Sequence, residues 1–260
     1  MERKFKPDNI LKYAYYQLNA CFYYLLEKIV SPKLPDHREI PIIINNYNRL
    51  AMLKRLIESL EKRGYTNIHI IDNCSTYPPL IEYYKSCRYH IFYLDKNVGM
   101  KSLWLTGIYK QFRNNYFVYT DPDVVPVDEC PDDFMKFFLE VLQKHKLARK
   151  VGFSLKLDDL PDHNLTKKEV LEVEGRFYDY PQEGMLYRAP IASTFALYRP
   201  FGKVKHGNNY VEMYRTAFPY MALHLPWYSD SRTPDDEERY YLEHLTLSTY
   251  YTTRSKKFMK

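Results

Sequence analysis

Between residues 40 and 126 the sequence alternates regularly between short apolar, β-branched segments and segments with helical spacing. The strand-like segments are 40–44, 68–71, 91–94 and 116–120, and each ends in a polar cluster. The helical segments 50–63, 80–86 and 101–113 lie between them. This order predicts a parallel sheet with right-handed crossovers. In such a sheet the polar clusters all lie at the carboxyl ends of the strands, which is the edge that binds ligands.

The fourth strand-like segment ends abruptly in two carboxylates on either side of a proline, Asp121-Pro122-Asp123. The strand cannot continue as a central strand, because proline has no amide hydrogen to donate. Residues i and i+2 of an extended chain share a face, so Asp121 and Asp123 can converge on one site. Two hard oxygen ligands suit Mg²⁺ or Mn²⁺. The alternative is a solvated Asx turn.

The composition limits the class of protein. The 260 residues suffice for one domain with extensions, and the net charge of +6 comes without a long basic run, so nucleic-acid binding is not predicted. The four cysteines are scattered and form no metal-type pair, which is typical of a reduced, cytoplasmic protein. We find no run of about 20 apolar residues, the length that a membrane-spanning helix needs.

Both ends of the chain have helical patterns. In residues 8–30, apolar side chains recur at spacings of four and three and form one stripe, which we expect to pack on the domain. A homodimer seam and a peripheral membrane contact are the alternatives. A second helix is predicted at 235–253, where the acids of 235–238 are helix-capping residues rather than catalytic ones. The basic tail at 256–260 either frays in water or contacts the inner face of a membrane.

Four segments, in order, resemble motifs of the family 2 glycosyltransferases. Residues 41–49 resemble the opening strand and its Pro-Thr-Tyr-Asn-Arg loop, and residues 70–76 resemble the Asp-Asp-Gly-Ser-Thr element. Residues 97–101 are similar to the Asn-x-Gly loop, and residues 120–123 stand in the place of the Asp-x-Asp motif. The sequence differs at Asn45-Asn46, in place of Pro-Thr, and at Asn73-Cys74, in place of Asp-Gly.

The resemblance implies an α/β protein with the GT-A fold, in which helices flank a mostly parallel central sheet. The expected organisation is an N-terminal helical extension at 1–36, the GT-A domain at 37–232, and a C-terminal helix with its tail at 233–260. The resemblance also implies transfer of a sugar from a nucleotide-sugar donor, which is usually UDP-linked.

The same resemblance assigns roles to individual residues. The side chains expected around the base and ribose are Asn46, Tyr47, Arg49 and Asp72, the last as an acceptor for the base. Those expected near the ribose and phosphates are Asn97, Gly99, Lys101 and Asp121. Asp123 is expected to hold Mn²⁺ or Mg²⁺ on the diphosphate, where the cation would stabilise the charge of the leaving group.

The C-terminal half offers three further candidates. His224 ends a mostly apolar run, and we consider it both as a further metal ligand and as a hydrogen-bonded core histidine. An inverting transfer needs a base that deprotonates the acceptor hydroxyl, and Glu212 and Asp230 are the candidate carboxylates.

The sequence therefore predicts a metal-dependent, inverting glycosyltransferase. Its donor would be a UDP-sugar and its acceptor a glycan or lipid-linked glycan of a bacterial-type surface polysaccharide. The alternatives are a catalytically silent nucleotide- or glycan-binding module on the same fold, and a nucleotidyltransferase. The second alternative is disfavoured because no glycine-rich, lysine-bearing phosphate loop is present near the start.

Overall fold

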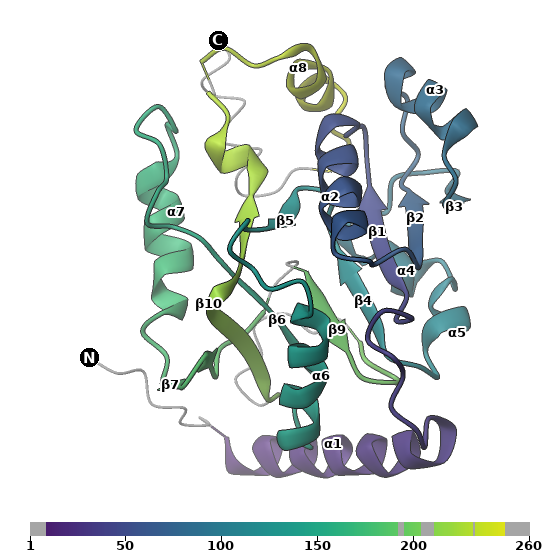
Figure 1. Ribbon diagram of the computed structural model, residues 1–260, viewed down its shortest axis with the longest axis vertical. Coiled ribbons are helices and arrows are strands. Elements are labelled where there is room, and N and C mark those ends of the chain that lie inside the picture. The colour runs from purple at the N-terminus through teal and green to yellow at the C-terminus, as the bar shows by residue number, and fades with distance from the viewer. Residues whose placement is uncertain (1–8, 192–194, 204–210, 231, 248–260) are drawn as a thin grey trace.

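A computed structural model describes residues 9–191, 195–203, 211–230 and 232–247. Figure 1 shows one twisted sheet with helices on both faces, the N-terminal helix across one end and the C-terminal helix at the other. The strands are β1 (Ile42–Asn46), β2 (Ile68–Asp72), β3 (His90–Tyr93), β4 (Phe117–Thr120), β5 (Val124–Pro126), β6 (Lys150–Leu155), β7 (Gln182–Glu183), β8 (Leu186–Tyr187), β9 (Ala196–Tyr198) and β10 (Met213–His224).

The sheet has the order β3-β2-β1-β4-β9-β6-β10-β8-β7, and β5 pairs with β10. The ladders between β1, β2, β3 and β4 are parallel, as predicted. Strand β9 is antiparallel to both β4 and β6, and β6 is parallel to β10. In the central part of the sheet, β3, β2, β1, β4, β6 and β10 therefore run in one direction with β9 reversed among them, which makes the central sheet mostly parallel.

Alternate side chains of the central strands enter two different apolar layers. Ile42 and Ile44 of β1 pack with α2 (Ala51–Lys62), α3 (Pro78–Ser86) and α6 (Phe134–Lys144). Ile43 lies in the other layer, with the short helices α4 (Ser102–Leu105) and α5 (Tyr109–Phe112). Burial of both faces explains why these strands are continuous apolar runs rather than alternating ones.

The predicted helix at 101–113 is wrong as a continuous element. The structure has a 3₁₀ turn, η1 (Gly99–Lys101), followed by α4 and α5 as two separate short helices. Gly107 lies between them with φ of +80°, a left-handed conformation that no helix can include. By contrast, α2 ends where the sequence indicates, just before Gly64, which also has φ of +80°.

Strand β5, which the sequence did not indicate, connects the carboxyl end of β4 to the C-terminal half. The short strand β5 follows Asp123 and pairs antiparallel with the end of β10, so that Val124 lies opposite His224. Pro126 is tolerated because it is the last residue of this three-residue strand. The region before β10 contains α7 (Lys167–Glu174), the turn η2 (Gly175–Phe177), β7 and β8.

The N-terminal helix α1 (Ile10–Val30) forms as predicted, with Asn9 accepting from the amide of Lys12 at 2.9 Å as its N-cap. The expectation that its apolar stripe packs on the domain is wrong. Large apolar side chains along the whole helix are exposed: Ile10, Leu11, Tyr15, Leu18, Phe22, Leu25 and Ile29. The stripe therefore faces away from the sheet.

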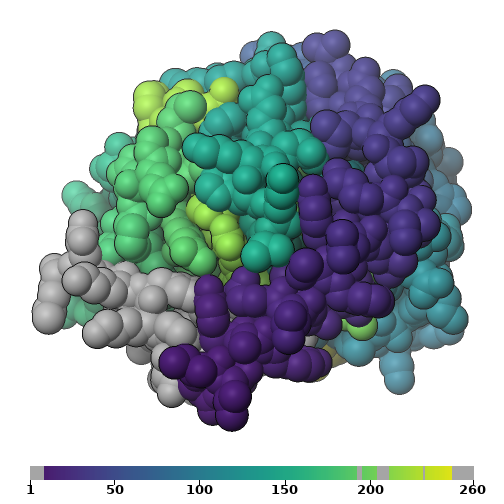
Figure 2. All heavy atoms as spheres, turned by 90° about the horizontal axis from the view of Figure 1, so that it is seen from below, coloured from purple at the N-terminus to yellow at the C-terminus, as the bar shows by residue number. Residues whose placement is uncertain are grey.

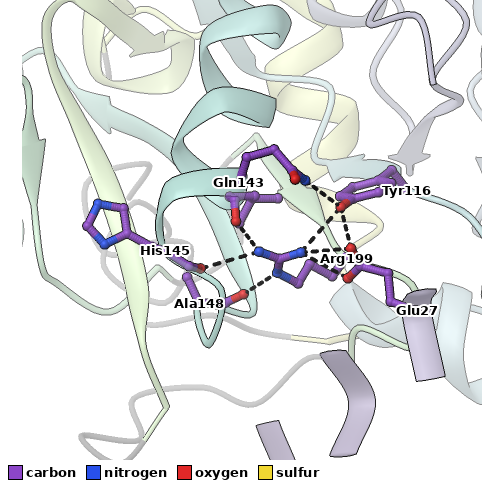
Figure 3. A network of polar contacts seen from close by, with 7 residues as sticks. Glu27, Tyr116, Gln143, His145, Ala148 and Arg199 are labelled. Carbon is purple, nitrogen blue, oxygen red and sulfur yellow. Dashed lines mark hydrogen bonds and ion pairs between the residues drawn. The ribbon is translucent and has the colours of Figure 1, made fainter. Parts of the chain in front are cut away.

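A buried polar network fixes the other face of α1 to the domain (Figure 3). Both oxygens of Glu27 accept from Nη1 of Arg199 at 2.9 Å, and the hydroxyl of Tyr116 donates to Glu27 at 2.6 Å. The Arg199 guanidinium also donates to backbone carbonyls of Leu142, His145 and Ala148. Because Tyr116 is the residue before β4 and Ala148 lies two residues before β6, α1 is anchored at the edge where the parallel strands begin.

The C-terminal helix α8 (Asp236–Glu243) lies at the opposite edge of the sheet. Its N-cap is Asp235, whose side chain accepts from the amide of Glu238 at 2.7 Å, which confirms the capping interpretation of these acids. The prediction that this helix continues past Glu243 is wrong for residues 244–247, which are described and not helical. The predicted helix beyond residue 247 and the basic tail lie outside the described residues. None of the helices in the described ranges is long and apolar enough to cross a membrane.

Candidate functional site

The polar clusters predicted from the sequence meet at one edge of the sheet. Asn46 and Asp72 are the last residues of neighbouring parallel strands and are directly opposite in register. Ile44 pairs with Thr120, so the Asp121-Pro122-Asp123 segment leaves the sheet beside the loop that follows β1. The loops after β1, β2, β3 and β4 therefore share the carboxyl edge, the location of ligand sites in open α/β sheets.

Asn46 and Asp72 are connected through a tyrosine beneath the surface of this edge. Nδ2 of Asn46 donates to the hydroxyl of Tyr84 at 2.8 Å, and that hydroxyl donates to Oδ1 of Asp72 at 3.2 Å. Oδ2 of Asp72 accepts from the amide of Ser75 at 3.1 Å. Burial raises the pKa of Asp72, although these hydrogen bonds act in the opposite direction. Both side chains are therefore buried beneath the loops at this edge of the sheet.

Asn48 and Asn73 hold the loops of this edge together, although no role was predicted for either side chain. Asn48 adopts a left-handed conformation with φ of 52°, and its Oδ1 accepts from the amides of Thr76 at 2.7 Å and Tyr77 at 3.0 Å. Its own amide donates to Oγ of Ser75 at 2.9 Å. Asparagine tolerates φ > 0 better than most residues, and this is the only signal in the sequence that could have indicated its role.

Asn73 stands where the family pattern has an aspartate, and it fixes the loop after β3. Its Oδ1 accepts from the amide of Val98 at 2.8 Å, and its Nδ2 donates to the carbonyl of Gly99 at 3.1 Å. A carboxylate at this position could not donate the second hydrogen bond. The substitution therefore fits the local structure, because one amide side chain satisfies both an acceptor and a donor of the neighbouring loop.

The Asn97–Lys101 loop is otherwise held by its own turn. The amide of Gly99 donates to Oδ1 of Asn97 at 2.9 Å, and Gly99 has φ of +76°. Lys101 is exposed at the end of this loop. Asp121 is half-buried at the end of β4. The structure thus places all four of these predicted donor-binding residues at the carboxyl edge.

The pairing of β5 with β10 brings the two predicted metal ligands together. Nε2 of His224 lies 3.6 Å from Oδ2 of Asp123, although 101 positions separate them in the sequence. The amide of Leu225 donates to the carbonyl of Asp123 at 2.8 Å and fixes this pairing. The ring of His224 packs against that of Trp227, with centroids 4.4 Å apart.

This pair fits a divalent cation that takes its other ligands from substrate and water. Oδ1 of Asp123 and Nδ1 of His224 are buried without a hydrogen-bond partner among the described residues. No group of three or more potential protein ligands is present in the part of the chain that the structure describes. Mg²⁺ and Mn²⁺ sites on nucleotide phosphates commonly need only one or two protein ligands. The oxygen and nitrogen donors are compatible with Mn²⁺.

Arg49, predicted at the base and ribose, is held by the C-terminal helix. Its guanidinium pairs with the carboxylate of Glu238 and lies over the ring of Tyr241, 3.6 Å from the centroid. The arginine side chain is 6% exposed and the glutamate 19%. The aromatic ring and the carboxylate both stabilise the positive charge of Arg49. Arg49 is therefore buried, and Glu238 is the member of the pair that is partly open to solvent.

The remaining contacts of the C-terminal segment also fall on predicted donor-binding loops. Oε2 of Glu237 accepts from the amides of Leu50 and Ala51, both at 2.8 Å, and so caps α2 from outside that helix. The hydroxyl of Tyr47 donates to the carbonyl of His244, and that of Tyr240 to the carbonyl of Thr76 at 2.9 Å. The segment 235–247 therefore covers the loops after β1 and β2.

The structure separates the two candidate bases. Asp230 lies six residues after His224 and forms an ion pair with Arg232 at 2.9 Å. Hydrogen bonds from Arg232 lower the pKa of Asp230 to about 2, which makes this carboxylate a weak base.

Glu212 directly precedes β10, while His224 ends that strand. The strand length places Glu212 on the order of 30 Å from the metal pair, at the edge where α1 is anchored. Its carboxylate there accepts from the hydroxyl of Tyr214 at 2.6 Å. Glu212 is thus not brought together with the other predicted site residues.

Three solved structures resemble this chain, each at 13% sequence identity. TarS residues 1–349 from S. aureus has a TM-score of 0.45, with 85% of this chain and 70% of that chain covered. GalNAc-T7 with UDP, GalNAc and Mn²⁺ has a TM-score of 0.40, with 70% and 43% covered. A cytidylyltransferase from Leptospira borgpetersenii has a TM-score of 0.32, with 56% and 76% covered.

The sequence matches no curated protein. A family model does match: the one described as Glycosyl transferase family 2 matches residues 42–185, which include β1 to β5 and the loops of the carboxyl edge. The matched segment is more than half of the 260 residues. The chain therefore belongs to glycosyl transferase family 2 and is a glycosyltransferase with the GT-A fold.

Proposed function

We propose that this glycosyltransferase uses a nucleotide-sugar donor, UDP-linked, together with Mn²⁺ or Mg²⁺ held by Asp123 and His224. The observation that carries the proposal is the 3.6 Å approach of these two side chains at the same edge as the donor-binding loops. A bound cation would offset the charge that develops on a leaving nucleoside diphosphate. The two residues come from distant parts of the chain, and only the β5–β10 pairing brings them together.

The chain's own residues supply the rest of the donor site. Tyr47 and Arg49 would border the base and ribose, while Asp72 and Asn73 keep the surrounding loops in place. Lys101 would add a positive charge near the phosphates. Since α8 covers the first of these loops and pairs with Arg49, donor binding requires α8 either to shift or to form one wall of the site.

The acceptor is proposed to be a hydroxyl of a glycan or lipid-linked glycan in surface polysaccharide synthesis, with inversion at the anomeric carbon. Inversion needs a base, and Asp230 is the remaining candidate, because it follows the end of β10 where His224 lies. It would act only after release from Arg232, because the ion pair keeps its pKa near 2. An Arg232→Ala variant should raise that pKa toward the ordinary value for aspartate.

A thermal-shift panel tests the donor site. Nucleoside diphosphates and nucleotide sugars are added with and without Mn²⁺ to the wild type, to Asp123→Ala and to His224→Ala. The matched control is Asp128→Ala, an exposed aspartate two residues after β5. We expect uracil nucleotides with Mn²⁺ to stabilise the wild type and the control by about 2.7 kcal/mol at one hundred times the Kd. Both site variants should lose this shift.

The panel also separates the alternatives. Stabilisation by a nucleotide with no release of nucleoside diphosphate from any nucleotide sugar would indicate the silent binding module. Consumption of a nucleoside triphosphate and a sugar phosphate, with pyrophosphate as a product, would indicate a nucleotidyltransferase. Absence of any nucleotide-dependent shift would contradict the donor site and make Asp121-Pro122-Asp123 a structural turn.

A further inference from the structure

Helix α1 presents a large apolar face at the edge of the sheet where the parallel strands begin. The seven side chains of the stripe are each 59% to 81% exposed: Ile10, Leu11, Tyr15, Leu18, Phe22, Leu25 and Ile29. Figure 2 shows the protein from below, with α1 in purple on the face turned toward the viewer. Contiguous apolar patches of more than a few hundred Å² on a protein surface mark interaction sites.

The domain fixes the direction in which this stripe points. Glu27 is 1% exposed and is bound to Arg199, and Tyr23 stacks on Phe201 with centroids 5.9 Å apart. Ala20, on the same side of the helix, is also buried. Rotation of α1 to bury the stripe would expose these groups and break the ion pair. The outward orientation is therefore a built-in feature of the fold.

A basic pocket opens beside the stripe, between α1 and the first residues of β6 and β10. It has a volume of about 180 Å³, and Tyr15 of the stripe belongs to its lining. Three cationic side chains line it: Arg149, Lys150 and Lys203. The Arg149 guanidinium lies 4.6 Å from the centroid of the Tyr23 ring, which attaches the pocket to α1.

The charges of this pocket favour an anion. Glu212 is the acidic residue of its lining, and its carboxylate is already engaged by Tyr214 and by Arg188 at 3.6 Å. Lys150 is 2% exposed and donates to the hydroxyl of Tyr198 at 3.1 Å. Burial lowers the pKa of Lys150 to about 7, so a bound anion would stabilise its charged form.

We propose that this end of the protein docks on an anionic phospholipid membrane. The stripe of α1 lies in the plane of the interface and enters the acyl boundary, and the pocket receives the phosphate of a lipid headgroup. A helix with an apolar face of leucine, isoleucine and phenylalanine next to basic side chains is suited to this arrangement. Tyrosines around the stripe are also favourable, since their rings have one apolar and one polar end.

Charge complementarity favours a membrane over a second copy of the chain. The exposed charged side chains of α1 are Lys12 and Lys28, and its single acid, Glu27, is buried. A homodimer through this face would bring the basic pocket with Arg149 and Lys203 of one copy near that of the other, which is unfavourable for like charges. An anionic leaflet would instead attract these basic side chains.

Docking through α1 would fix the orientation of the enzyme on the membrane. α1 lies at the start of β4 and β6, whereas Asp123, His224 and the donor-binding loops lie where the parallel strands end. A docked protein would therefore present its candidate site to water, and a lipid-linked acceptor in the same membrane could reach it only through a glycan long enough to span the domain. The test below measures binding to vesicles and does not depend on the donor site or on turnover.

Vesicle co-sedimentation of the full-length chain tests the apolar stripe. We expect binding to phosphatidylcholine vesicles that contain phosphatidylglycerol. Leu18→Glu, at the centre of the stripe, should weaken it at least about tenfold, since burial of one leucine contributes a factor of that order. The matched control is Leu105→Glu, a leucine on α4 that is 65% exposed, and it should bind like the wild type. Equal loss in both variants would overturn the proposal.

Charge reversal tests the pocket. Lys203→Glu should weaken binding to the anionic vesicles about tenfold, as expected for the reversal of one charge near the surface. Lys96→Glu, an exposed lysine after β3, is the matched control and should have no effect. Equal binding of the wild type to neutral and anionic vesicles would overturn the headgroup pocket.

Analytical ultracentrifugation completes the test. A stable dimer that Leu18→Glu converts to a monomer, together with no vesicle binding by the wild type, would show that the stripe is a homodimer seam instead. A wild type that is monomeric and binds only anionic vesicles is the expected result.

Discussion

Two helices, one near each end of the chain, are held at opposite edges of the same sheet by glutamates, but in very different surroundings. Glu27 of α1 is 1% exposed and accepts two hydrogen bonds from one arginine inside the domain. Glu238 of α8 is 19% exposed and pairs with Arg49, which is 6% exposed and follows β1 at the candidate donor site. The first contact is enclosed by protein, whereas a ligand can approach the second.

This difference determines what each helix can do. Removing one partner of a buried pair leaves an uncompensated charge, so α1 is expected to stay in place under all conditions in which the domain is folded. In the second pair Arg49 is 6% exposed and only Glu238 is partly open to solvent, so the carboxylate of α8 is the partner that an anionic ligand can replace. Helix α1 can therefore present its outer face for binding, whereas α8 can shift when the donor binds.

The largest expected effect is on the buried contact of α1. Glu27→Ala should lower the free energy of unfolding by about 3–5 kcal/mol, because the Arg199 charge would remain buried without its carboxylate. Urea denaturation of the purified protein measures this loss. The control is Glu82→Ala, which removes a pair with Lys85 in which both side chains are mostly exposed. That control should cost at most about 0.5 kcal/mol. Similar losses in the two variants would contradict the distinction.

Lys150, near α1, should make stability depend on pH. Burial lowers its pKa from 10.5 to about 7 in the folded protein. Between these two values the unfolded chain binds more protons, so stability should rise with pH, by up to about 1.4 kcal/mol for each pH unit. Urea denaturation of the wild type and Lys150→Met across this range isolates the contribution. The difference between the free energies of unfolding of the wild type and Lys150→Met should change with pH. No such change should accompany Lys168→Met, which replaces an exposed lysine.

A smaller effect is expected from the cap that α8 gives to α2. Glu237→Ala removes a carboxylate that accepts from the amides of Leu50 and Ala51, and should lower stability by about 1 kcal/mol, the usual value of a helix N-cap. Asp236→Ala on the same helix is the control, because its side chain is 91% exposed. If both variants had the same stability, Glu237 would not hold α8 to the domain.

The smallest effect concerns competition between α8 and the donor. Glu238→Gln removes the carboxylate that neutralises Arg49, and should tighten the binding of UDP about threefold, within the range of partly exposed pairs. Isothermal titration in the presence of Mn²⁺ measures the affinity, with Glu243→Gln as the control on the same helix. Weaker binding would show instead that Glu238 holds Arg49 in a productive position.

The regular part of the fold was predictable because its pattern is local. Burial on both faces makes β1, β2 and β4 continuous apolar runs, and the alternation with helices determines their parallel order. The family motifs lie at the ends of these strands, so the carboxyl edge could be predicted from residues such as Asp72 and Asp123. The sequence also indicated correctly that Asp235 begins a helix.

The remaining features depend on contacts between distant segments. The orientation of α1 is determined by Glu27 and Arg199, which are 172 positions apart, and the apolar stripe alone gave the opposite orientation. Glu212 was predicted as a candidate base from its position in the sequence, but it precedes β10 and lies at the edge opposite the donor-binding loops. The cover that α8 forms over Arg49 could not be predicted, because a glutamate next to a helix cap has no distinctive local pattern.

Release of UDP from nucleotide sugars in the presence of Mn²⁺ tests the central claim most directly. The wild type, Asp123→Ala and the control Asp128→Ala are compared on a panel of UDP-sugars with glycan acceptors. We predict release by the wild type and the control, and a loss of at least about a hundredfold in Asp123→Ala, the usual order of effect when a group that stabilises developing charge is removed. Equal rates for Asp123→Ala and the wild type would contradict a donor site at this edge.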